Sequence, residues 1–178
     1  RDAQRKLQEI DRHLAQRTAR LRLLQQLQEK WEGFGEGAKA VLQGRLDFPL
    51  SALGQEQAAL TADRLSDERV DRMISSPLLR AAETATVVAT RLGMDWAPEP
   101  VLLEYDVGLV SGMTGPQIRE RYPEIAAQYA SGRRPMFPGE EGRETFFERL
   151  RGFLNGFEAN DETVVAIAHG GVIGALCY

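Results

Sequence analysis

Residues 163–168, TVVAIA, form a continuous apolar run, and His169, Gly170 and Gly171 follow it directly. An apolar run of this length with β-branched residues is typical of a strand buried on both faces of a parallel sheet. Paired glycines after such a strand permit a sharp turn into a helix. Ligands bind beyond the carboxyl ends of parallel strands. The run therefore predicts a buried strand that places His169 at the ligand-binding edge of a sheet.

Two other segments have the composition of strands, and helices are expected between them. The strands are predicted at Val70–Ser75 and Pro100–Tyr105. Apolar residues at three- and four-residue spacing predict helices at 51–65, 78–92, 115–129 and 144–158, and a last helix after Gly171. Alternating strands and helices are typical of parallel sheets with crossover helices. We therefore expect a three-layer α/β fold with a short parallel sheet of about three strands.

The N-terminal part of the chain has a different pattern. Residues 2–31 contain no glycine or proline, and apolar residues recur at heptad spacing from Leu7 to Trp31. This pattern predicts a long amphipathic helix with coiled-coil character, which either packs on its own domain or pairs with a second chain. Four glycines in residues 32–44 end that helix. We therefore divide the chain into a segment 1–44 and an α/β domain 45–178.

Composition limits the classes of function. The net charge is -4, with eight basic and four acidic residues in 1–30 and 14 and 22 in the remainder. Such a chain has no general attraction to nucleic acid or anionic membranes, and it has no apolar run of membrane-spanning length. A single cysteine, Cys177, forms no intrachain disulfide, which is typical of the cytoplasm. The glycine-rich segment fits no P-loop or dinucleotide motif, and we expect neither a cofactor nor a metal.

Polar side chains suited to phosphoryl chemistry follow the three predicted strands. Arg80 ends the sequence SSPLLR, Glu104 lies at the end of the second strand, and His169 follows the third. A guanidinium binds phosphate bidentately, a carboxylic acid donates a proton, and a histidine can contact the transferred group. A lone histidine at a strand end is more often structural. The combination nevertheless favours one shared anion-binding edge, to which the amide of Gly170 contributes.

Four motifs in this order resemble the histidine phosphatase (phosphoglycerate mutase-like) superfamily over about residues 43–178. They are QGRLDFPL at 43–50, SSPLLRA at 75–81, LE at 103–104 with the glycines after it, and AHGGVI at 168–173. The resemblance implies a phosphomonoester hydrolase or mutase fold. It implies that Arg80, His169 and Gly170 bind phosphate and that Glu104 donates a proton. A phosphorylated small molecule or inorganic phosphate is the implied partner.

The sequence departs from that family pattern at both ends. The family begins with a strand that ends in Arg-His-Gly, whose histidine becomes phosphorylated, but the corresponding place here reads KWE at 30–32. His13, the only histidine besides His169, lies within the predicted N-terminal helix and is expected to be a solvated helix residue. The family's last strands are also expected to be missing. We therefore expect weak or absent phosphohistidine chemistry with phosphate binding retained.

Residues 1–44 carry a second resemblance. The leucine- and glutamine-rich helix followed by WEGFGEGAKAVL at 31–42 resembles the coiled-coil-to-hinge junction of structural maintenance of chromosomes proteins. It implies a chimera, natural or engineered, joined near Gln43–Asp47. The alternative function is therefore non-enzymatic assembly through the N-terminal helix. A missing first strand leaves a sheet edge unpaired, which favours self-association or coverage by that helix.

Overall fold

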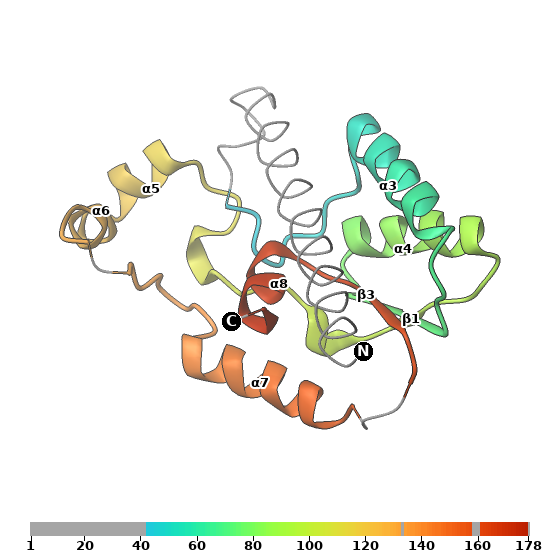
Figure 1. Ribbon diagram of the computed structural model, residues 1–178. Coiled ribbons are helices and arrows are strands. Elements are labelled where there is room, and N and C mark those ends of the chain that lie inside the picture. Colours follow the sequence, from blue (N-terminus) through green and yellow to red (C-terminus); the bar gives the residue numbers. More distant parts are fainter. Residues whose placement is uncertain (1–41, 133, 158–160, 178) are drawn as a thin grey trace, which may run out of the picture. The chain divides into compact units, whose positions relative to one another are not determined.

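The computed structural model describes residues 42–132, 134–157 and 161–177 (Figure 1). The chain divides into two compact units, Arg1–Ala40 and Val41–Tyr178, and the description below concerns the second. The predicted coiled-coil seam from Leu7 to Trp31, together with His13, lies outside the described residues. These expectations, and the predicted boundary after residue 44, therefore stay predictions.

Within the described residues, three parallel strands form the sheet, in the order β2–β1–β3. The strands are β1 (Arg72–Ser75), β2 (Ala97–Pro98) and β3 (Val164–Ile167). The central strand β1 pairs in parallel with both neighbours, and Ile74 lies opposite Ala166 of β3. The predicted α/β class with a short parallel sheet is therefore confirmed.

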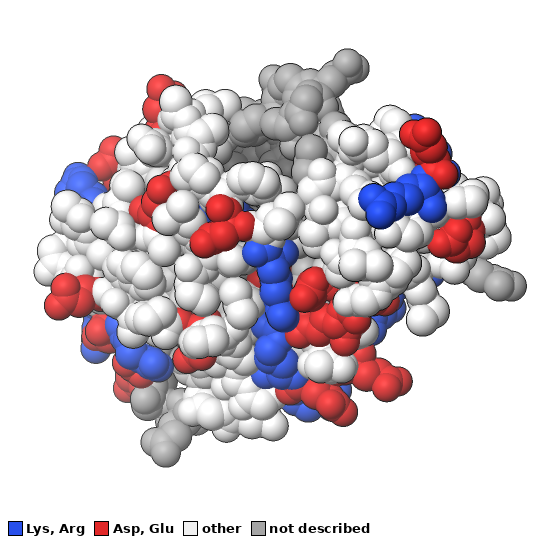
Figure 2. Space-filling model, turned by 180° about the vertical axis from the view of Figure 1, so that it is seen from behind, with Lys and Arg blue, Asp and Glu red and all other residues white. Residues whose placement is uncertain are grey.

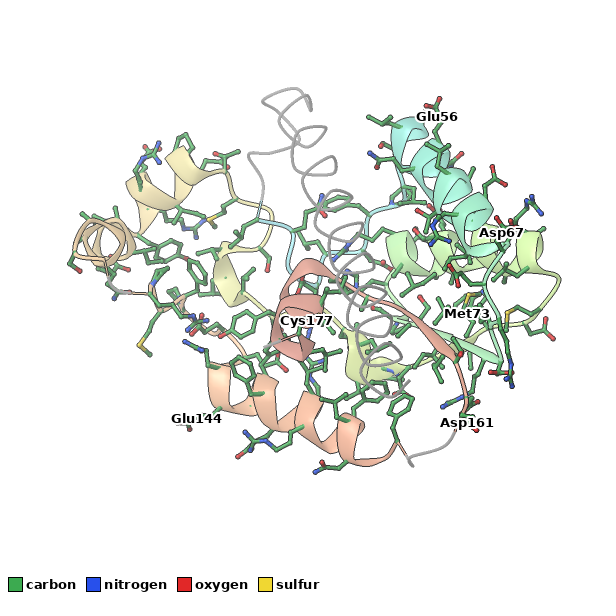
Figure 3. The ribbon with its side chains drawn as sticks, in the orientation of Figure 1. Glu56, Asp67, Met73, Glu144, Asp161 and Cys177 are labelled. Atoms are coloured by element: carbon green, nitrogen blue, oxygen red, sulfur yellow. The ribbon has the colours of Figure 1, made fainter. Side chains whose placement is uncertain are left out.

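Helices cover both faces of this sheet (Figure 1). They are α3 (Ala52–Leu65) and α4 (Leu79–Leu92) on one face, and α7 (Arg143–Asn155) and α8 (Gly170–Leu176) on the other. Successive strand residues point to opposite faces. Met73, labelled in Figure 3, accordingly packs in one apolar cluster with Val88 of α4, whereas Ile74 packs with Leu150 and Val172. The predicted three layers are present in the described part of the chain.

The predicted strand Pro100–Tyr105 is wrong. The ladder ends with β2, and the chain continues as the 3₁₀-helix η1 (Pro100–Leu102). Proline cannot donate to a ladder and has the backbone φ of a first helical residue. The Glu99 carboxylate also accepts a hydrogen bond from the N–H of Val101, which caps η1. Glu104 therefore lies in a loop beyond η1 and not at a strand end.

The third strand is in its predicted place but is less buried than expected. Residues 163–168 were expected to be buried on both faces, yet β3 is only half-buried and Ala166 is exposed. The reason is the position of β3 at one edge of the sheet within the described residues. An apolar run predicts a strand but does not show how many neighbours that strand has.

The segment predicted as one helix at 115–129 forms two. These are α5 (Gly115–Arg121) and α6 (Pro123–Ala130). A residue before proline is disfavoured in the helical region, and Tyr122, with a φ of -133°, ends α5. Ile118 and Ile125 from the two helices pack on Val110 in a separate apolar cluster. This cluster supports the loop that contains the 3₁₀-helix η2 (Gly108–Val110).

The surface of the described domain carries charges of both signs. On the face shown in Figure 2, basic and acidic side chains lie next to one another. The exposed ion pairs of the described residues include Arg64 with Glu68 and Arg91 with Asp63. Across the described ranges, every helix is too short or too polar to cross a membrane.

Candidate active site

Three separate segments bring the predicted site residues together. Arg80 lies in the first turn of α4, directly beyond β1. His169 lies between β3 and α8, and Glu104 lies in the loop between η1 and η2. The charge of Arg80 interacts with both Glu104 and His169. The three side chains therefore share one edge of the sheet, although Glu104 reaches it from a loop.

Arg80 is held in place by the loop that carries the QGRLDFPL motif. Its Nη1 donates to the Leu46 carbonyl at 2.8 Å, and its Nη2 donates to the Gly44 carbonyl at 2.9 Å. Burial lowers the pKa of this guanidinium, while the negative charges of Glu104 and Asp47 oppose that shift. An arginine remains protonated in proteins. Arg80 is therefore a fixed, half-buried positive charge at the site.

The same loop is fastened to α4 by two carboxylates. Asp47 Oδ1 accepts the N–H of Leu79 at 2.5 Å, which satisfies a free donor at the start of α4. Glu83 Oε2, one turn further along α4, accepts the N–H of Leu50 at 2.7 Å. These bonds fix the loop carbonyls that orient Arg80. The positioning of Arg80 therefore depends on residues from the first motif of the sequence.

His169 is buried, with 7% of its surface exposed. Its Nε2 lies 2.7 Å from the hydroxyl oxygen of Ser76, which is fully buried. Burial, together with the positive charge of Arg80, lowers the pKa of His169 to about 4. The imidazole is therefore neutral at neutral pH, and Arg80 supplies the positive charge of this part of the site.

Glu104 is held against the start of α8. Its carboxylate accepts the N–H of Gly171 at 3.2 Å and the N–H of Tyr105 at 2.8 Å. A Cβ atom at residue 171 would overlap Glu104 Oε1, whereas a Cβ at Gly170 would meet no atom within 4 Å. Gly171 is therefore the glycine that lets the carboxylate approach, and Gly170 is an exposed residue beside it.

An ion cluster centred on Glu141 fixes the backbone around Glu104. Glu141 Oε1 lies 3.0 Å from Arg45 Nη2 and 3.0 Å from Arg149 Nε, and its Oε2 accepts from Arg149 Nη2 at 3.1 Å. Arg45 Nε donates to the carbonyl of Glu104 at 3.0 Å, and Arg149 Nη1 donates to that of Leu103 at 3.0 Å. Glu141 thus holds the two arginines that clamp the acid-bearing loop.

Sequence reasoning missed this cluster and the contact of Ser76 with His169. Ser76 lies within the SSPLLR sequence, so its position before Arg80 was visible, but its hydroxyl contact was not. Glu141 lies in the loop PGEEG at 138–142. Its charge alone does not indicate that it pairs with Arg149 of α7 and with Arg45 in a loop far away in the sequence. In the described residues, no group of three or more His, Cys, Asp or Glu side chains is arranged to hold a metal ion.

Comparison with known proteins identifies relatives of the chain. Phosphoserine phosphatase 1 of Hydrogenobacter thermophilus is 32% identical over 153 residues, which span 84% of this chain and 70% of that protein. The native structure of a mycobacterial glucosyl-3-phosphoglycerate phosphatase is 31% identical with a TM-score of 0.66, over 79% of this chain and 71% of that one. Its complex with inorganic phosphate is 32% identical with a TM-score of 0.64, over 76% and 70%.

A family model covers most of the chain. The model of the histidine phosphatase superfamily (branch 1) matches residues 28–178. The match begins before the predicted join at Gln43–Asp47 and includes residues 31–42. The comparisons do not show the predicted resemblance of that segment to chromosome-maintenance proteins, which stays a prediction. The predicted resemblance over 43–178 is confirmed by this match and by the relatives. The chain belongs to the histidine phosphatase superfamily, branch 1.

Proposed function

We propose that this domain binds the phosphoryl group of a phosphate monoester, or inorganic phosphate, at the edge formed by Arg80, Glu104 and His169. The observation that carries the proposal is the convergence of a half-buried cation, a carboxyl group and a neutral imidazole from three segments. Relatives named as phosphatases of phosphoserine and glucosyl-3-phosphoglycerate support it, as does the relative solved with inorganic phosphate.

Each residue has a distinct proposed role. Arg80 neutralises the phosphoryl charge, because a guanidinium suits the geometry of phosphate oxygens. His169 and the amide of Gly170 contact phosphoryl oxygens as hydrogen-bond donors. Glu104 donates the proton that a departing alcohol requires. The hydrogen bond from Gly171 keeps the Glu104 carboxyl beside the start of α8.

We further propose that the phosphohistidine step is weak or absent. Residues 28–178, which match the family model, contain one histidine, His169. His169 already has the role of the family's second histidine, so no histidine in that range is left to accept the phosphoryl group. Loss of a covalent nucleophile lowers a hydrolytic rate by a factor on the order of 10³ or more. The proposed activity is therefore phosphate binding with slow or no turnover.

Titration with inorganic phosphate, followed by calorimetry, tests the binding site. We expect Arg80→Gln and His169→Ala to weaken phosphate binding, by about tenfold or more for the charged contact. Arg91→Ala is the control, because Arg91 lies on the same helix in an exposed ion pair with Asp63. Equal affinities in the wild type and in both site variants would exclude this site.

Hydrolysis of an aryl phosphate, measured in parallel, tests turnover. We expect a slow rate in the wild type and a lower one in His169→Ala. Equal rates in the two proteins would exclude a catalytic role for His169. Its role in phosphate binding is tested separately by the titration.

Gly171→Ala tests the proposed role of Glu104. The added Cβ overlaps Glu104 Oε1, so the Glu104 carboxyl group has to move. Because the Glu104 side chain is flexible, it can move without a shift of the backbone. We expect any aryl phosphatase activity to fall by about tenfold or more, since misplaced catalytic groups lose rate steeply. The measurement is the rate with Gly174→Ala as the matched control, because Gly174 lies on the same helix and a Cβ there meets no atom within 4 Å. A similar loss in both variants would contradict the role assigned to Glu104.

Non-enzymatic assembly through the N-terminal helix stays an alternative prediction, because the residues that carry it lie outside the described ranges. Sedimentation at micromolar concentration tests it, and a monomer would count against it.

A further inference from the structure

Ser76 is a fully buried polar residue to which the proposed function gives no role. It lies directly after β1, and its N–H donates to the Ile167 carbonyl of β3 at 2.8 Å. Its hydroxyl oxygen lies 2.7 Å from Nε2 of His169. A serine hydroxyl has one hydrogen to donate and two lone pairs that accept. The other hydrogen-bond partners of the Ser76 hydroxyl therefore decide whether Ser76 Oγ or His169 Nε2 carries the hydrogen between them.

The hydrogen bonds around Ser76 favour donation from serine to histidine. The N–H of Leu78 donates to Ser76 Oγ at 3.4 Å, so this oxygen already accepts one hydrogen bond. The hydroxyl of Ser75 donates to the Ser76 carbonyl at 3.0 Å and does not take part in the contact with His169. If Nε2 carried a hydrogen, the buried hydroxyl hydrogen of Ser76 would lose its one partner among the described residues. Leaving a buried donor without an acceptor is costly.

The other ring nitrogen then carries the proton. His169 is neutral at neutral pH because burial and the charge of Arg80 lower its pKa to about 4, so one ring nitrogen has a hydrogen and the other does not. Nδ1 makes no hydrogen bond to the described residues. Because these residues include no buried side-chain nitrogen or oxygen without a partner, Nδ1 is accessible from the surface. It is the ring position left for a ligand.

We propose that Ser76 is a positioning residue that fixes His169 as its Nδ1–H tautomer, so that the histidine offers an anion an uncharged hydrogen-bond donor. This inference rests on the proposed phosphate site for its ligand, but the tautomer itself does not depend on phosphate. In this arrangement Arg80 and His169 have different roles. Arg80 supplies the positive charge, and His169 supplies a directed N–H without adding a second charge beside the guanidinium.

Nitrogen-15 NMR of the histidine side chains tests the proposal on the full chain. The two neutral tautomers and the imidazolium have different ¹⁵N shifts and two-bond couplings. The sequence has only two histidines, so His13→Gln assigns the signals. At neutral pH we expect His169 to show a protonated Nδ1 and an unprotonated Nε2. A wild-type spectrum with protonated Nε2, or with imidazolium, would overturn the proposal without any variant of the site.

Ser76→Ala and Ser75→Ala form a matched pair. Both serines are fully buried, but only the Ser76 hydroxyl contacts His169. We expect Ser76→Ala to shift the tautomer toward Nε2–H and to weaken phosphate binding by about threefold to tenfold, whereas Ser75→Ala keeps the wild-type tautomer. An unchanged tautomer in Ser76→Ala contradicts the assignment.

The phosphate titration separates the two proposals. If the tautomer changes as expected but no variant binds phosphate, the proposed function fails and the positioning role of Ser76 stands. If phosphate binds through Arg80 and His169 but the tautomer does not respond to Ser76, the role of Ser76 is wrong and the function stands.

Discussion

Gly108→Ala is expected to lower the free energy of unfolding by about 3 kcal/mol. Gly108 has a φ of +62°, which costs an alanine about 1 kcal/mol or more. A Cβ there would overlap the Pro138 carbonyl oxygen and lie 2.5 Å from Gly139 C and 2.7 Å from Glu140 N. These are backbone atoms, so no side-chain rotation relieves the contact, and overpacking adds about 1–3 kcal/mol. Urea denaturation measures the loss.

Gly93→Ala is the matched control for that substitution. Gly93 ends α4 with a φ of +67°, but a Cβ there meets no atom within 4 Å. We expect a loss of about 1 kcal/mol, which is the cost of the backbone conformation alone. Equal losses in the two variants would show that the close approach of residue 108 to the loop 138–140 does not matter for stability.

Glu141→Ala is also expected to lower the free energy of unfolding by about 3 kcal/mol. The Glu141 side chain is 8% exposed, and its arginine partners Arg45 and Arg149 are 33% and 18% exposed. Removing the central carboxylate leaves Arg149 without a carboxylate partner among the described residues, and leaves Arg45 with only the more distant carboxylate of Asp106, at 3.7 Å. Breaking a buried pair at one partner is much more costly than the net contribution of the pair. The measurement is again urea denaturation, followed by circular dichroism.

An exposed ion pair gives the control for Glu141. Glu68 pairs with Arg64 within one helical turn, and its side chain is 51% exposed. Glu68→Ala is expected to change the free energy of unfolding by about 0.5 kcal/mol or less. A comparably small effect of Glu141→Ala would mean that water solvates the two arginines once the carboxylate is removed. It would also mean that the cluster does not hold the Glu104 loop.

The parts of the site that could be predicted are those that follow from strand order. His169 follows β3, and Arg80 lies in the first turn of the helix that follows β1. The carboxyl ends of parallel strands meet at one edge of a sheet. Glu104 was assigned to the right edge for a wrong reason. Its predicted strand begins at Pro100, which instead starts the 3₁₀-helix η1, and Glu104 reaches the site from the loop beyond η1.

The parts that could not be predicted depend on contacts between distant loops. Glu141 and Arg45 lie in two loops far apart in the sequence, and Arg149 lies in α7. No periodicity in the sequence indicates that these three side chains meet. The exposure of Ala166 depends on the number of strands beside β3, which the apolar run of that strand does not encode. Hydrogen-bond direction at Ser76 likewise requires the positions of Leu78 and His169.

The contacts of Arg80 explain why residue 80 has to be an arginine. A guanidinium has five N–H groups in a rigid plane, and Arg80 directs one each from Nη1 and Nη2 to the Leu46 and Gly44 carbonyls. The remaining N–H groups donate to no described residue, and they are the ones assigned to the proposed phosphate. A lysine has a single nitrogen at the end of a flexible stem, so it could not hold both loop carbonyls in this geometry and also contact the proposed phosphate.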